Sequence, residues 1–73
     1  MKNIIRVKCV EEFKMYDNTK TELMADVEEK EYEAQLYNET EEYFAKDSEG
    51  REFLVGEIDN RDVILQEGFE LIG

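Results

Sequence analysis

The chain has 73 residues, 9 of them basic and 20 acidic, which gives a formal net charge of −11 at pH 7. A chain of this length forms one domain, residues 1–73, and buries only about 60% of its unfolded surface, which excludes a spacious internal active site. The acidic excess also excludes direct nucleic-acid binding, because phosphate contacts depend on Lys and Arg.

The sequence carries no pattern for secretion or membrane insertion. The apolar run that starts at Ile4 is too short for a signal peptide and is broken at once by Arg6 and Lys8. No stretch approaches the roughly 20 apolar residues of a membrane span. Cys9 is the only cysteine, so no internal disulfide is available. We therefore expect a cytoplasmic protein that is held together by packing alone.

Residues 4–10 alternate as a β-strand with one buried face does, with Ile5, Val7 and Cys9 on the apolar side. We interpret Cys9 as a small buried apolar residue rather than a reactive thiol. The sequence has no His, and a thiolate needs a positive partner.

Residues 11–30 are predicted to form a long loop. Phe13 and Tyr16 are scattered among polar residues, and Asp17–Thr19 is the clearest turn signal. We expect Phe13 and Tyr16 to anchor this loop on the rest of the domain, since single apolar residues near the surface are common and need no special role.

Residues 21–37 fit two patterns. The spacing of Leu23, Val27 and Ala34 is helical, which gives an alternative α+β fold with a helix over about residues 20–36 packed on a three- to four-stranded antiparallel sheet. Against this, residues 31–36 alternate strictly between polar and apolar side chains, as a half-buried strand does. We favour the strand over residues 31–36.

Residues 41–56 contain the strongest local signal, two apolar runs joined by a short loop that ends in glycine. A loop over Ser48–Gly50 places Gly50 in the left-handed position of a type I turn followed by a bulge. The side chains predicted on the core face are Tyr43, Ala45, Phe53 and Val55. The predicted register pairs Lys46 with Glu52, Ala45 with Phe53, Phe44 with Leu54 and Tyr43 with Val55.

Residues 57–62 are a second turn cluster, and the apolar run at 63–65 leaves no room for a long element. Residues 69–72 are predicted to form a closing strand that pairs near residues 4–10, because small closed sheets leave fewer exposed edges. The whole pattern predicts a mainly β fold, a small barrel of five strands.

Four short segments, together with Tyr43, occur in a familiar order: Val7–Val10, Lys30–Ala34, Asp47–Glu52 and Phe69–Ile72. They resemble small SH3-like β-barrel proteins that are common in bacteriophages and mobile elements of Firmicutes. The resemblance implies an SH3-like five-stranded barrel and a mobile-element origin, and it carries no catalytic or ligand residues across. That group usually has a Gly before the Lys-x-Tyr-Glu pattern, where this chain has Glu28 and Glu29. The chain also lacks the Trp of peptide-binding SH3 domains.

The sequence gives little indication of residues that could form a catalytic or metal-binding site. With no His, and with Ser48 as the only serine, the chain offers no general base and no activated nucleophile. The acidic pairs Asp59/Asp62 and Asp47/Glu49 are interpreted as turn residues rather than as cation ligands. We predict no enzymatic activity, no metal site and no cofactor.

The acidic bias is concentrated after residue 20, where seventeen acids meet four basic residues. Nine of these acids fall within residues 22–42, offset only by Lys30, and should create a negative field that attracts basic proteins. The residues predicted to form this acidic face are Glu28, Glu29, Glu31, Glu33, Glu39, Glu41 and Glu42. The other interpretation is an ordinary solvated face that keeps a small protein soluble.

The leading hypothesis is an interaction protein, of the kind that bacteriophages encode, that docks this acidic face on a basic, nucleic-acid-binding surface of a host protein such as a nuclease. It would act as a nucleic-acid mimic and anti-defence inhibitor, as anti-CRISPR proteins do. The alternative is an SH3-like structural or adaptor module, monomeric or homodimeric, whose contact surface is formed by Tyr16, Tyr37 and Phe44. The first predicts salt-sensitive binding and the second salt-tolerant binding.

Overall fold

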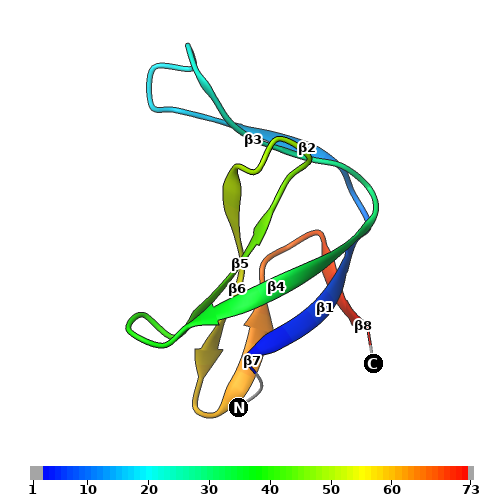
Figure 1. The fold of residues 1–73 in the computed structure, drawn as a ribbon, viewed down its shortest axis with the longest axis vertical. Coiled ribbons are helices and arrows are strands. Elements are labelled where there is room, and N and C mark those ends of the chain that lie inside the picture. The colour runs from blue at the N-terminus through cyan, green and yellow to red at the C-terminus, as the bar shows by residue number, and fades with distance from the viewer. Residues whose placement is uncertain (1–2, 73) are drawn as a thin grey trace.

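The computed structural model describes residues 3–72, and all of its regular elements there are β-strands (Figure 1). The strands are β1 (Ile4–Cys9), β2 (Phe13–Tyr16), β3 (Leu23–Val27), β4 (Glu31–Tyr37), β5 (Glu42–Lys46), β6 (Glu52–Asp59), β7 (Asp62–Leu65) and β8 (Phe69–Ile72). The mainly β prediction is confirmed. The alternative helix over residues 20–36 is wrong, because β3 and β4 occupy that segment.

Six strands form one antiparallel sheet in the order β7-β6-β5-β4-β1-β8, and β2 and β3 form a separate two-stranded sheet. The large sheet curls until its edge strands β7 and β8 come into contact, which makes it a small, nearly closed β-barrel. It has one strand more than the predicted five, since the short apolar run near Val63 pairs with β6 as β7.

The predicted loop over residues 11–30 is wrong, because that segment contains the β2–β3 hairpin. β1 leads into β2 and β3 leads into β4, so together they form one long ribbon that bends near residues 10–12 and 28–30 (Figure 1). Phe13 packs edge-on against Phe69 at 5.9 Å between ring centroids, as an anchor should. Tyr16 does not anchor the hairpin, since 52% of it is exposed.

The β5–β6 hairpin follows the predicted register at three of its four pairs, from Lys46–Glu52 to Phe44–Leu54. Gly50 has φ of 80°, and Asp47 N donates to Arg51 O at 2.9 Å, as a turn with a bulge requires. The fourth pair is wrong: a bulge between Tyr43 and Phe44 moves Tyr43 opposite Gly56.

Gly56 is required where β6 passes between β5 and β7. A Cβ at this position would lie 2.7 Å from the carbonyl oxygen of Ile64, closer than van der Waals contact permits. The bulge and the glycine together let β6 bend across the barrel while Tyr43 and Val55 remain fully buried, on the predicted core face.

The C-terminal strand closes the sheet as predicted. β8 pairs with β1, and Phe69 lies opposite Cys9.

Of the turn cluster at residues 57–62, only Asn60 and Arg61 form the turn. Their φ angles of 54° and 69° are those of a two-residue type I′ hairpin.

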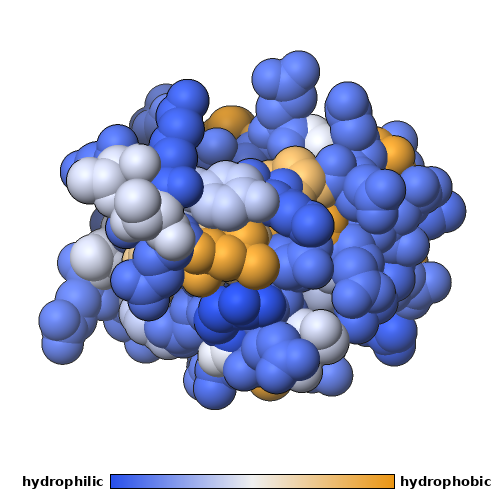
Figure 2. Space-filling view, turned by 90° about the horizontal axis from the view of Figure 1, so that it is seen from above, coloured by the Kyte–Doolittle hydropathy of each residue, from blue (hydrophilic) through white to orange (hydrophobic). Residues whose placement is uncertain are grey.

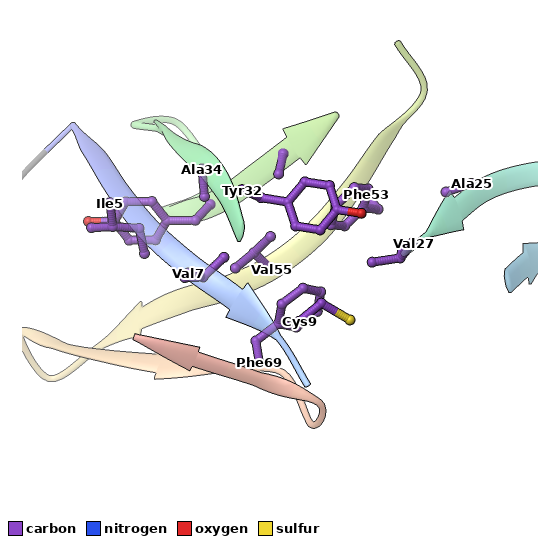
Figure 3. Close-up of a cluster of buried hydrophobic side chains, with 12 residues drawn as sticks. Ile5, Val7, Cys9, Ala25, Val27, Tyr32, Ala34, Phe53, Val55 and Phe69 are labelled. Carbon is purple, nitrogen blue, oxygen red and sulfur yellow. The ribbon is translucent and has the colours of Figure 1, made fainter. Parts of the chain in front are cut away.

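The core lies inside the barrel and at its junction with β3. Cys9 is fully buried, as predicted, and its Sγ donates to the backbone oxygen of Glu11 at 3.2 Å. The Tyr32 and Phe53 rings meet edge-to-face at 5.2 Å. Figure 3 shows Ala25 and Val27 of β3 covering one end of this cluster. The labelled core residues are Ile5, Val7, Cys9, Ala25, Val27, Tyr32, Ala34, Phe53, Val55 and Phe69.

Residues 3–72 contain no helix of the length and apolar character needed to cross a membrane.

Candidate binding groove between β4 and β5

The predicted acidic residues lie along β4 and at both of its ends. Glu28 and Glu29 occupy the bend before β4, and Glu31 and Glu33 lie on its exposed face. Glu39 and Glu41 are in the turn after it, and Glu42 begins β5. The ends of β4 are separated by roughly 20 Å of extended chain. The seven carboxylates are therefore spread along the whole length of β4.

The exposed face of β4 is partly neutralised by β1. Arg6 lies opposite Glu33 and Lys8 opposite Glu31, and Arg6 Nη2 contacts Glu31 Oε1 at 3.0 Å. Both side chains of this ion pair are more than half exposed, so it stabilises the fold by at most about 1 kcal/mol. The sequence correctly predicts that Glu31 and Glu33 point outward. The basic side chains that lie opposite them are visible only in the strand register.

Of the three predicted aromatic residues, two lie together. The rings of Tyr37 and Phe44 are 4.8 Å apart between centroids, on the outer face of β4 and β5. The hydroxyl of Tyr37 donates to a carboxylate oxygen of Glu52, and this carboxylate raises the pKa of Tyr37. Tyr16 lies on the separate β2–β3 sheet and is not part of this pair.

β4 and β5 separate beyond this aromatic pair. Their ladder runs from Tyr37–Glu42 to Gln35–Phe44 and stops there. In the part of the chain that the structure describes, β4 residues 31–34 have registered partners on β1 and none on β5. β5 continues instead along β6, to the pair Lys46–Glu52. The two strands thus leave a split in the sheet.

A groove of about 410 Å³ occupies this split. We call it the β4–β5 groove. Its lining residues are Lys30, Glu31, Tyr32, Glu33, Gln35, Tyr37, Phe44, Ala45, Lys46, Asp47 and Glu52. Because the inward-facing Tyr32 and Ala45 line it as well as outward residues, the groove enters between the strands rather than lying on one face. Its volume is at the lower end of the range for ligand clefts.

Backbone groups of β4 also point toward the groove. Leu36 N donates to Asn3 O, and Cys9 N donates to Lys30 O, so even-numbered residues of β4 bond toward β1. By the alternation of an antiparallel ladder, Glu31 and Glu33 direct their N–H and C=O groups to the β5 side. There the β4–β5 ladder does not reach them.

Asp47 fixes the far wall of the groove. This buried carboxylate accepts hydrogen bonds from Asp26 N, Glu49 N and Arg51 N at 2.8–2.9 Å and from Arg51 Nε at 2.8 Å. Burial alone would raise the pKa of Asp47, but these donors outweigh burial and hold the pKa well below its usual range. The network ties the β5–β6 turn to β3. The interpretation of Asp47 as a turn residue is therefore consistent with its bonds.

The groups that line this groove are of the kinds that can bind a ligand. The groove offers carboxylates, an aromatic pair and strand backbone, and its Lys30 Nζ lies 5.4 Å from the centroid of the Tyr32 ring, a cation–π distance. Residues 3–72 bring no three His, Cys, Asp or Glu side chains together as a metal site. Sequence reasoning identified Glu31, Glu33, Tyr37 and Phe44 separately. It missed the gap between β4 and β5 around which these residues gather. The point at which two strands stop pairing leaves no signal in the local sequence.

Comparison with protein-family models, with curated proteins and with solved structures finds no match to this chain.

Proposed function

We propose that this protein is a non-enzymatic interaction protein that binds a basic segment of a partner protein in the β4–β5 groove. The observation that supports this most is the convergence of Glu33, Glu52 and the Tyr37–Phe44 pair on one groove. Carboxylates attract a Lys or Arg head group, and the aromatic rings pack against its aliphatic stem or face its charge. The groove therefore has the parts that a basic side chain needs.

The charge of the whole chain supports the same proposal. At −11 on 73 residues, the protein attracts basic partners over a distance and repels nucleic acid. Such steering raises the association rate and weakens as salt increases. The local pairing of Arg6 with Glu31 lowers the field at β4 but leaves the net charge dominant.

More specifically, we propose that the partner is a nucleic-acid-binding protein of the host cytoplasm, such as a nuclease. The protein would block the partner's basic surface, as an anti-defence inhibitor encoded by a phage. The net charge and the resemblance to SH3-like barrels of mobile elements support this form. The ion pair of Arg6 with Glu31 interrupts the carboxylates along β4, which favours capture of a basic segment over imitation of a continuous phosphate row.

A second candidate, an adaptor that binds through exposed aromatics, is favoured by the Tyr37–Phe44 pair. Tyr37 is 41% exposed, so a partner would find apolar surface there. Apolar burial is not screened by salt, so this adaptor would bind equally well at low and high ionic strength.

Two double variants test the proposal at equal net charge. Glu33→Lys with Glu52→Lys reverses charge inside the groove, and Glu22→Lys with Glu67→Lys does so at exposed positions outside it. Binding of a labelled nine-residue arginine peptide is measured by fluorescence anisotropy at about 50 mM and 500 mM NaCl. We expect the groove variant to lose at least about tenfold in affinity and the control less than about threefold.

The adaptor candidate gives a different pattern. Replacing Tyr37 and Phe44 by Ala would then abolish binding to a partner protein captured from host lysate by the wild-type protein, while the charge reversals and added salt would have no effect. If the two charge-reversal variants bind the arginine peptide equally, attraction is general and the groove is not the site. Displacement of a labelled oligonucleotide from the captured partner tests the blocking role.

A further inference from the structure

We propose that the partner segment binds as an added β-strand, antiparallel to β4, along the part of β4 that β5 leaves uncovered. This inference rests on the proposed function, because it describes how a basic segment occupies the β4–β5 groove. The occupant is an extended peptide in which basic residues alternate with small apolar ones.

The backbone of β4 supplies the docking edge. Glu31 and Glu33 direct N–H and C=O groups toward the groove, beyond the last β4–β5 pair at Gln35–Phe44. An added strand that continues this register makes a pair of hydrogen bonds with each of them. Strand addition of this kind derives affinity from main-chain bonds and specificity from alternate side chains.

The two faces of the groove dictate the alternation. A peptide residue opposite Glu33 shares its outward face, where Glu33 and Glu52 favour Lys or Arg. The peptide residues that alternate with these outward-facing ones point inward. They lie over Tyr32 and Ala45, which are buried and line the groove. These positions favour small apolar side chains such as Val.

The fold keeps this edge open. β5 parts from β4 after Phe44, while on its other edge it stays paired with β6 as far as Lys46–Glu52. The turn beyond it is held by Asp47, which bonds Arg51 within the turn and Asp26 N of β3 at 2.9 Å. The split is therefore fixed by a buried network rather than left by a loose strand end.

The test uses an acetylated, amidated peptide of seven residues in which Arg and Val alternate. Two derivatives carry backbone N-methyl groups, one on the inner Arg residues and one on the inner Val residues. In the proposed register the Arg N–H groups face β4 and the Val N–H groups face away. We expect methylation at Arg to weaken binding at least about tenfold and methylation at Val less than about threefold.

NMR on the labelled protein provides the second measurement. Addition of the unmodified peptide should shift and protect the amides of Glu31 and Glu33, and the variant Glu33→Lys with Glu52→Lys should abolish both effects. If the peptide binds, loses affinity with that variant, and yet tolerates both methylations equally, strand addition is wrong while the proposed function stands. If neither this peptide nor the arginine peptide binds the wild-type protein, both proposals fail.

Discussion

At the scale of single residues, Asp47 determines the geometry of the β5–β6 turn. Four donors converge on one buried carboxylate: the backbone N–H groups of two turn residues, that of Asp26 in β3, and the guanidinium of Arg51. The sequence marks Asp47 only as a turn former. Its bond to Asp26 N, 21 residues away in the chain, depends on where the β2–β3 hairpin packs.

Asp47→Asn should destabilise the protein, since the amide keeps a similar shape but loses the charge that Arg51 and the backbone donors favour. We expect the melting temperature at pH 7 to fall by at least about 5 °C. Thermal unfolding followed by circular dichroism measures the change. Glu49→Gln is the matched control, because that exposed carboxylate of the same turn accepts none of these bonds, and it should melt within about 2 °C of wild type.

The stability added by Asp47 should depend on pH in a defined direction. Its pKa is lowered in the folded state, so the stabilisation is complete above the unfolded value near 3.8 and is lost as the pH falls below it. Denaturant melts at pH 7, 4 and 2.5 should show the difference between wild type and Asp47→Asn shrinking. A difference that grows on acidification would contradict the network.

At the scale of elements, β4 is a central strand in one half and an edge in the other. At Gln35 it has partners on both β1 and β5, whereas at Glu33 it pairs with β1 alone. This change within one strand of seven residues creates the groove. It also makes neighbouring amides differ in their hydrogen bonding, which exchange with solvent can detect.

Hydrogen exchange should separate Glu33 from Ala34 in the free protein. The Ala34 amide bonds toward β1 inside the ladder, while the Glu33 amide points into the split. We expect Ala34 to exchange at least about tenfold more slowly than Glu33 after correction for intrinsic rates. Equal protection of the two amides, measured by NMR, would mean that the split is closed in solution.

The β2–β3 hairpin shows why local pattern was insufficient for one element. Its strands contain Lys14, Ala25 and Asp26, residue types that are depleted in strands, and the alternation around Met24 is weak. Ala25 and Val27 become fully buried only because β3 crosses the end of the barrel. Figure 2, viewed from that end of the molecule, shows a small hydrophobic patch among hydrophilic side chains.

At the scale of the whole molecule, net charge opposes folding. A charge of −11 confined within a radius of gyration of 12.1 Å repels itself, and within residues 3–72 the ion pairs Arg6–Glu31 and Arg51–Asp47 offset little of it. The same charge that would steer the proposed basic partner therefore lowers stability at neutral pH.

Added salt should consequently stabilise the free protein. Between about 10 and 150 mM NaCl the screening length falls from about 30 to about 8 Å, which weakens the repulsion between distant carboxylates. We expect the melting temperature at pH 7 to rise by about 2–5 °C. Near pH 4, where protonation removes most of the net charge, the same salt step should have little effect. A melting temperature that falls with salt at pH 7 would show that attractive pairs dominate.

The sequence by itself determined the strands whose side chains alternate and the hairpin whose loop ends in Gly50, because both depend on neighbours in the chain. It also determined the excess of negative charge. Only the tertiary structure decided that residues 13–27 form a hairpin, that a bulge at Tyr43 shifts the register, and that β4 and β5 part beyond Phe44. These features depend on burial against distant strands and on the bond from Asp26 to Asp47, and no local pattern encodes such contacts.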